Sequence, residues 1–298
     1  MDRFHLMNVF VAVAEEQGFA ATARRLHMSP PAVTRAVAAL EDQLGVKLLN
    51  RTTRFVRVTE AGRRYLEDAK RILDDLKAAD EAAAGINAEP RGQMVITAPV
   101  LFGRMFVMPG IVDYLNTYPR TEVSAMFLDR IVNLLEEGID VGIRIGELPD
   151  SSLRALRVGS VRRVTCASPQ YLQRNGLPRK PQDLPGHSII ASSAGNNAID
   201  WRFDNVALRI QPRLTVTTND AAIEAACSGF GITRLLSYQV AQQLGEGGLQ
   251  LILEKYEPAP LPIYIVHREG RFAAARIRAF VDLMAKRLRA DNALNQPV

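Results

Sequence analysis

The segment that most constrains the fold is Ser29–Leu44, because it carries a clear signal for the start of a helix. Ser29 suits an N-cap, where its hydroxyl accepts a hydrogen bond from a free N–H of the first turn. Pro30 suits the first helical position, which needs no N–H. Apolar residues then recur at helical spacing and predict one buried stripe, made of Val33, Val37, Leu40 and Leu44.

The opposite side of this helix is unusual for a solvated face. It carries Pro31, Arg35, Ala38 and Asp42, which are mostly small, with one arginine near the N-terminal end. The major groove of DNA admits such a helix, and arginine pairs well with guanine edges there. A short helix over Phe19–Leu26 and a tight connection precede it, which is the helix-turn-helix plan. An ordinary helical hairpin in a core is the alternative interpretation.

Charge is distributed unevenly along the 298 residues, whose formal net charge is +5. Residues 20–65 hold nine Lys or Arg and three acidic residues, whereas residues 66–90 hold three basic and seven acidic residues. A basic head followed by an acidic segment is typical of a phosphate-binding domain on a solvated connector. The length allows two or three domains at roughly 100–200 residues each.

Two cysteines, Cys166 and Cys227, are too few for a disulfide framework or a thiolate metal site. We therefore expect a cytoplasmic protein without a metal or other cofactor. Leu6–Ala14 imitates a short secretory signal, but residues 2–17 fit an amphipathic helix equally well, and we favour the helix. No run approaches the roughly 20 apolar residues of a membrane span, so no membrane partner is expected.

Gly45 suits the end of the helix that begins after Ser29. A β-hairpin is predicted after this glycine. Two short extended runs, Val46–Leu49 and Arg54–Val58, flank a polar tip. Arg51 and Arg54 suit contact with phosphate or with the minor groove; a solvated hairpin is the alternative.

A long helix is predicted after Thr59, a suitable N-cap. Its apolar positions recur at spacings of four and three, the pattern of a coiled-coil seam, which we expect to pair two copies of the chain. The seam residues are Tyr65, Ala69, Ile72, Leu76, Ala79, Ala83 and Ile86. Coverage of the seam by the chain's own second domain is the alternative. Residues 90–92 break the helix.

Beyond residue 92, short β-like runs alternate with helices, which indicates an α/β domain with largely parallel strands and two lobes. The expected strands cover residues 94–98, 123–128, 141–145, 161–167, 188–191, 207–210, 213–217, 231–233 and 263–266. The expected helices cover residues 102–116, 130–137, 169–174, 220–228, 238–244 and 271–288.

Several stretches of the first 65 residues share the pattern of a known family: Gly18–Leu26, Ser29–Arg35, Leu40–Glu41, Leu44–Gly45, Arg51–Arg54 and Val58–Gly62. In these stretches the sequence resembles LysR-type transcriptional regulators. Looser matches follow at Leu148–Leu153, Ala167–Leu172, Pro181–Leu184, Asn219–Asp220 and Gly229–Ile232. At the position of Thr34, the family more often has serine. At the positions of Thr233 and Arg234, the family usually has apolar residues.

The resemblance implies a winged helix-turn-helix at residues 1–58, a linker and dimerisation helix at 59–90, and a two-lobed α/β effector domain at 91–298 that is similar to periplasmic binding proteins. Lobe 1 would cover residues 91–161 and 268–290, and lobe 2 residues 162–267, with crossings near Val161 and His267. The implied DNA-binding residues are Thr22, Ser29, Pro30, Pro31, Ala32, Thr34 and Arg35, with Arg51, Thr53 and Arg54 in the wing.

Ligands of open α/β sheets sit beyond the carboxyl ends of strands, near helix N-termini. This geometry selects seven candidate effector-binding residues: Pro99, Val100, Leu128, Asp129, Ser192, Ser193 and Asn219. Arg104 and Arg144 would pair either with a carboxylate effector or with surface acids, and we favour the surface ion pairs.

The expected partners are double-stranded DNA, a small-molecule effector, further copies of the chain in a homodimer, homotetramer or larger ring, and RNA polymerase. Two other classes of protein, an enzyme and a solute-binding transport component, are the alternatives. The nucleophile-elbow, metalloprotease and phosphate-loop motifs of enzymes do not occur in the sequence, and the four histidines are scattered. A solute-binding transport component would need export, against which the amphipathic first helix argues.

Overall fold

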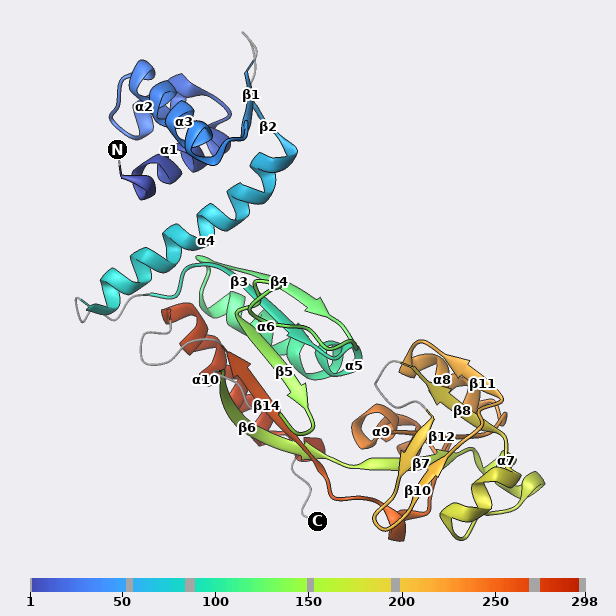
Figure 1. The fold of residues 1–298 in the computed structure, drawn as a ribbon. Helices are drawn as coiled ribbons and strands as arrows, with labels where there is room; N and C mark the ends of the chain where they lie inside the picture. The colour runs from blue at the N-terminus through green and yellow to red at the C-terminus, as the bar shows by residue number, and fades with distance from the viewer. Residues whose placement is uncertain are drawn as a thin grey trace. The chain divides into compact units, whose positions relative to one another are not determined.

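The computed structural model describes residues 2–51, 56–83, 89–148, 153–193, 199–267 and 274–294. The chain forms two compact units, Met1–Gln93 and Met94–Val298, and each is described by itself (Figure 1). We call them the N-terminal and the C-terminal unit. Among the helices that the structure describes, none combines the length and the apolar composition that a membrane span requires.

The N-terminal unit is a bundle of helices with a small hairpin. Its elements are α1 (Arg3–Glu16), α2 (Phe19–Arg25), α3 (Pro30–Leu44), β1 (Leu49–Arg51), β2 (Val56–Val58) and α4 (Glu60–Ala83). Both ends of α3 are as predicted: the Ser29 hydroxyl accepts from the Ala32 N–H, and Gly45 closes the helix with a φ of 68°. The strands β1 and β2 pair antiparallel at the base of the expected wing.

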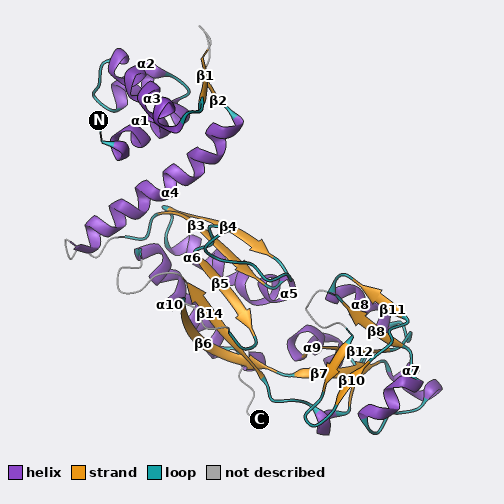
Figure 2. Cartoon of the chain, viewed as in Figure 1, coloured by secondary structure: helices purple, strands orange, loops and turns teal. Residues whose placement is uncertain are grey.

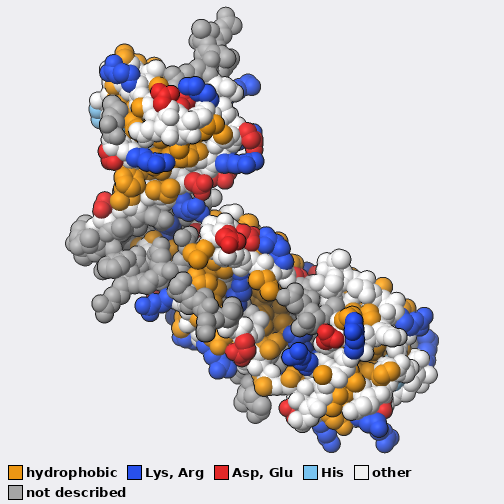
Figure 3. Space-filling view, viewed as in Figure 1, with side chains coloured by type: hydrophobic (Ala, Val, Ile, Leu, Met, Phe, Trp, Pro, Cys, Tyr) orange, Lys and Arg blue, Asp and Glu red, His pale blue; other side chains and the backbone are white. Residues whose placement is uncertain are grey.

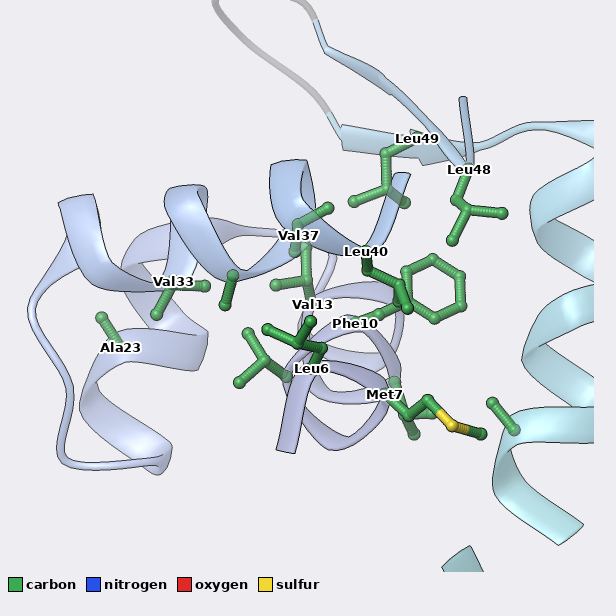
Figure 4. Close-up of a cluster of buried hydrophobic side chains, with 14 residues drawn as sticks. Leu6, Met7, Phe10, Val13, Ala23, Val33, Val37, Leu40, Leu48 and Leu49 are labelled. Atoms are coloured by element: carbon green, nitrogen blue, oxygen red, sulfur yellow. The ribbon is translucent and has the colours of Figure 1, made fainter. Parts of the chain in front are cut away.

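The core of this unit lies between α1 and α3. Leu6, Phe10 and Val13 of α1 are fully buried and face Val33 and Leu40 of α3 (Figure 4). The predicted stripe on α3 is therefore confirmed, with Leu44 half-buried at its end. The apolar run of α1 lies in a packed helix as expected, but this helix is not amphipathic, because only Asn8 is exposed between Leu6 and Val13.

Glu41 joins α3 to the base of the hairpin. Its carboxylate accepts hydrogen bonds from the Leu48 and Leu49 N–H groups at 3.0 and 3.1 Å and pairs with Lys47 at 2.9 Å. Burial acts to raise the pKa of Glu41, but Lys47 and these N–H groups outweigh it and hold the pKa below its ordinary value. Because the side chain is buried, these bonds fix the hairpin base against α3.

The first turn of α4 approaches the same hairpin base closely. Thr59 caps the helix, as predicted, by accepting from the Gly62 N–H at 2.9 Å. A Cβ atom at Gly62 would lie 2.1 Å from the Leu48 carbonyl oxygen, so only glycine fits at this crossing.

The predicted seam on α4 is divided. Ala69 is fully buried against the unit's own core and is not available to a second copy. Tyr65 is half-buried, and its ring packs 5.7 Å from Phe10, so the unit itself covers part of it. Farther along, Ile72 and Leu76 are 41% and 38% exposed. The side chains of Ala79 and Ala83, and the whole of Ile86, lie outside the described residues.

The C-terminal unit contains two five-stranded sheets, each with helices packed against it (Figure 2). Lobe 1 holds the sheet β4-β3-β5-β14-β6, formed by β3 (Gly92–Ala98), β4 (Thr121–Phe127), β5 (Val141–Ile145), β6 (Arg154–Val161) and β14 (Leu261–His267). Its helices are α5 (Val100–Phe102), a π-helical turn at Gly103–Val107, α6 (Met108–Thr117) and α10 (Ala275–Ala290). Tyr114 of α6 packs edge-on against Phe280 of α10, with ring centroids 5.3 Å apart.

Lobe 2 holds the sheet β11-β8-β12-β7-β13. Its strands are β7 (Arg163–Ala167), β8 (Ile189–Ser192), β11 (Leu214–Val216), β12 (Ile232–Leu236) and β13 (Gln250–Ile252), with a separate hairpin of β9 (Asp200–Arg202) and β10 (Ala207–Arg209). The α-helices are α7 (Pro169–Asn175), α8 (Asn219–Cys227) and α9 (Ser237–Gly245). Short 3-10 helices lie at Pro181–Gly186, Glu254–Tyr256 and, after α10, Asn292–Leu294.

Three predictions for this unit are wrong. The sheets are mixed: β14 runs antiparallel to β5 and β6, and β7 antiparallel to β12 and β13. Because β14 pairs within lobe 1, the second crossing between lobes lies before Leu261 and not near His267. Residues 130–137 form irregular backbone followed by turns instead of a helix, since the Asn133 side chain accepts from the Leu135 N–H and competes with helical bonding.

Candidate DNA-binding surface and effector cavity

The outer face of α3 is open in the N-terminal unit. Ser29, Pro30, Pro31, Thr34 and Arg35 are exposed. Ala32, also predicted to contact DNA, is half-buried on the same helix. Within the described part of the chain, Arg35 makes no ion pair or hydrogen bond, so its guanidinium is free to meet an external partner.

The first turn of α3 has few N–H groups to offer. Pro30 and Pro31 have none, and the Ala32 N–H is held by Ser29. The Thr34 hydroxyl donates to the Pro30 carbonyl at 3.0 Å. A phosphate therefore gains little from this helix terminus, and contact with DNA must come from side chains, with Arg35 the only charged one on this face near the N-terminus.

Thr22 does not belong to the exposed face. It is fully buried, and its hydroxyl donates to the carbonyl of Gly18 at 2.8 Å and, more weakly, to that of Ala12 at 3.2 Å. The prediction that its side chain contacts DNA is wrong, because this hydroxyl ties α2 to α1. Thr53 and Arg54 lie outside the described residues, and only the backbone of Arg51 is described, as the end of β1.

A cavity of about 930 Å³ lies in the C-terminal unit, with walls from both lobes. Five of the seven predicted effector-binding residues line it: Pro99, Leu128, Asp129, Ser192 and Asn219. On the visible face of this unit, hydrophobic side chains lie in a hollowed region with Lys and Arg side chains beside them (Figure 3).

Val100 and Ser193 do not line the cavity. The Val100 N–H, expected to be offered to a ligand, donates to the Asp129 carboxylate at 3.0 Å. The Ser193 hydroxyl donates to the Val216 carbonyl at 3.2 Å. Both groups are therefore occupied within the protein.

Asp129 places a carboxylate at the edge of the cavity, close to the Val100 N–H that donates to it. Burial raises its pKa above the ordinary value; the Val100 N–H acts against this shift, and the charge of Asp220 adds to it. Asp220 of lobe 2 also pairs with Arg104 of lobe 1 at 3.7 Å, so the expectation of an ion pair for Arg104 is confirmed.

Arginines were the main omission from the predicted effector site. Arg144, Arg163 and Arg234 all line the cavity. Arg144 was expected to pair with a surface acid, but its guanidinium donates to the Val132 carbonyl at 3.0 Å instead. The signal for Arg234 was present in the sequence, since a charge there departs from the apolar residues usual in the resembled family.

Aromatic side chains connect the two lobes beside the cavity. Tyr238 of α9 is buried, and its ring lies 5.4 Å from Phe102 and 5.7 Å from Phe106, edge-on to both. Phe102 and Phe106 belong to lobe 1, so these contacts cross from one lobe to the other.

Comparison with known proteins defines the class. Residues 4–63 match the family described as bacterial regulatory helix-turn-helix protein, lysR family, and residues 87–289 match the LysR substrate binding domain. A winged helix-turn-helix and a two-lobed α/β domain with a cavity define a ligand-responsive, DNA-binding transcriptional regulator.

The chain belongs to the LysR family of transcriptional regulators. It is 33% identical over 273 residues to the HTH-type transcriptional activator AaeR of Escherichia coli, covering 90% of this chain and 88% of that protein. It is 30% identical to the HTH-type transcriptional regulator CrgA of Neisseria meningitidis over 286 residues, covering 95% and 96% of the two chains.

Solved structures agree with this fold. The structure of CrgA from Neisseria meningitidis superposes with a TM-score of 0.61 at 30% identity, covering 95% of this chain and 98% of that one. The full-length Vibrio cholerae virulence activator AphB gives a TM-score of 0.60 at 27% identity, covering 96% and 99%. Family membership makes the protein a regulator and not an enzyme.

Proposed function

We propose that the protein binds a partly palindromic DNA site as a homodimer, or as a homotetramer or larger ring built from dimers, in the cytoplasm. The open face of α3 with its unpaired Arg35 is the observation that carries the proposal. Ser29, Pro30, Pro31, Ala32 and Thr34 would lie against the DNA beside Arg35, and Arg51, Thr53 and Arg54 of the wing would contact phosphates or the minor groove.

The proposed division of labour follows the predicted domains, with residues 1–58 binding DNA, 59–90 pairing the subunits and 91–298 binding the effector. Exposed Ile72 and Leu76 on α4 support the pairing. In the assembled regulator, contact with RNA polymerase would convert occupancy of the site into a change in transcription.

The effector would act by population shift. A small molecule in the cavity changes the relative position of the lobes only if it binds one arrangement better than the other. Of the seven effector-binding residues predicted from the sequence, the proposed contacts are the five that line the cavity: Pro99, Leu128, Asp129, Ser192 and Asn219.

Footprinting of the purified protein across its source genome, with and without candidate metabolites, tests the proposal. We expect protected sites with two-fold symmetry, whose extent changes with one metabolite, and binding that falls steeply as salt rises. Protection without sequence preference in every condition would contradict the proposal.

A further inference from the structure

Arginines enter the cavity from both lobes. Arg144 lies on β5 of lobe 1, whereas Arg163 and Arg234 lie on β7 and β12 of lobe 2. No acidic side chain among the described residues is within ion-pair distance of these three arginines. Arg130, which also lines the cavity, differs because Glu137 pairs with it at 2.6 Å.

Arg234 is held in a fixed orientation. Its guanidinium lies 4.4 Å from the centroid of the Phe203 ring and 5.9 Å from that of Trp201, and it donates to the Arg202 carbonyl. The Nε atom is buried without a hydrogen-bond partner. Stacking against aromatic faces pre-organises the planar donors of an arginine for a planar acceptor.

The positive charges in the cavity are incompletely balanced. Burial lowers the pKa of Arg234 to about 10, the charge of Arg163 lowers it further, and Glu257 partly opposes the shift. Burial also lowers the pKa of Arg144, and the charge of Glu137 partly opposes this shift. Since both guanidinium groups remain cationic near neutral pH, an anion placed between them would recover part of the cost of burying their charge.

The rest of the lining is mostly apolar. Leu128, Leu134 and Leu148 line it from lobe 1, and Ile190 and Leu236 line it from lobe 2. Asp129, Glu147 and Asp200 also reach the cavity. These carboxylates would repel the negative group of a ligand, whereas the arginines would attract it.

We propose that the effector is a small organic carboxylate with an apolar body, whose carboxylate binds Arg234 and Arg163 of lobe 2 together with Arg144 of lobe 1. The inference rests on the proposed function of the cavity as the effector site. Carboxylates accept paired hydrogen bonds from guanidinium groups, which gives both strength and orientation. A ligand held from both walls favours one arrangement of the lobes, as the population-shift mechanism requires.

Trp201 provides an internal probe, because it is the single tryptophan of the sequence and lines the same cavity. The intact protein is titrated with cyclohexanecarboxylate, hexanoate and succinate, and separately with the uncharged amide of each, while tryptophan fluorescence is recorded. We expect a saturable response to at least one carboxylate, with at least ten-fold weaker binding of its amide.

The variants Arg234→Gln and Arg144→Gln should each weaken binding of that carboxylate at least ten-fold, judged by dissociation constants and not by signal amplitude. Arg213→Gln is the matched control. Arg213 also stacks on a ring, Phe230 at 5.4 Å, and donates one hydrogen bond, to Ser188, but it does not line the cavity. The control should bind as tightly as the unchanged protein.

Three results would overturn the inference: no saturable response to any of the carboxylates, equal affinity for acid and amide, or unchanged affinity in both cavity variants. Footprinting with the same compounds separates this inference from the proposed function. If an amide but no carboxylate alters the footprint, the regulator is confirmed and its effector is uncharged. If a carboxylate binds without altering the footprint, the anion site stands and its coupling to DNA fails.

Discussion

Arg35 is the only charged side chain in the N-terminal part of the exposed α3 face, and it has no partner among the described residues. Arg35→Ala should weaken binding to the specific site by about 1–3 kcal/mol and relax base preference at one position of each half-site, because a bidentate contact to a base edge is lost. Competition binding against single-base variants of the footprinted site measures both effects.

The control for this prediction is Arg174→Ala, which removes an exposed arginine of α7 in the C-terminal unit. It should leave affinity and base preference unchanged. If Arg35→Ala instead weakens binding to all sequences equally, Arg35 contacts phosphate and does not discriminate bases.

Among the elements, α3 and the hairpin base depend on Glu41. Glu41→Gln should lower the free energy of unfolding by about 1.5–3 kcal/mol near neutral pH, because hydrogen bonds to a buried charged group weaken. Since the pKa of Glu41 is lowered on folding, its carboxylate stabilises the protein above its ordinary value of 4.5, and this contribution is lost as the pH falls through the lowered value.

Urea unfolding of the unchanged protein and Glu41→Gln, from about pH 7 to about pH 3, therefore has a definite expected outcome. The difference between the two proteins should shrink toward the acidic end. Asp42→Asn, at the exposed neighbouring position, is the control and should differ little at any pH. A constant difference for Glu41→Gln would show that its charge is unimportant.

The exposed apolar residues of α4 give a second prediction for an element. Leu76→Asp should weaken self-association, because it places a charge at a position we expect to be buried between two copies. Sedimentation velocity over a concentration series measures the change. Arg64→Asp introduces the same side chain at a highly exposed position nearer the start of the helix, so its oligomeric mass should not change.

How far the sequence predicts the elements depends on whether their signals are local. Ser29 and Gly45 mark the ends of α3 by their own chemistry, and both were placed correctly. Tyr65 and Ala69 share a helical repeat with Ile72, but the repeat does not reveal that α1 covers its first half. The antiparallel pairing of β14 likewise joins segments far apart in the chain, which periodicity cannot identify.

The candidate sites were likewise predictable where their signals are local, and not where they depend on contacts between distant segments. The exposed face of α3 was predictable because helical spacing separates it from the buried stripe. The rule that ligands sit beyond strand ends found Pro99, Leu128 and Asn219. It missed Arg163, which begins a strand, because entry into the cavity depends on how two lobes face each other.

At the scale of the whole C-terminal unit, the contacts of Tyr238 tie one lobe to the other. Tyr238→Ala should cost about 3–5 kcal/mol, because a buried ring is replaced by a cavity. Thermal unfolding measures the loss. Tyr238→Phe keeps both edge-on ring contacts and removes only the hydroxyl, which lies 3.3 Å from the Gln239 amide, so it should unfold at nearly the original temperature. Equal losses in both variants would show that the hydroxyl, and not the ring, is the stabilising group.

The packing of the first half of α4 against α1 has a consequence for how the N-terminal unit would move in a dimer. Phe10 packs on Tyr65, and Glu15 of α1 pairs with Lys70 at 2.9 Å, so one set of contacts joins α1 and α3 to the start of α4. In a dimer joined through the second half of α4, a change in the crossing angle of the two helices would swing both copies of α3 through the same arc. In such a dimer, the distance between the two half-sites would change with this crossing angle, while α1 and α3 would keep their internal packing.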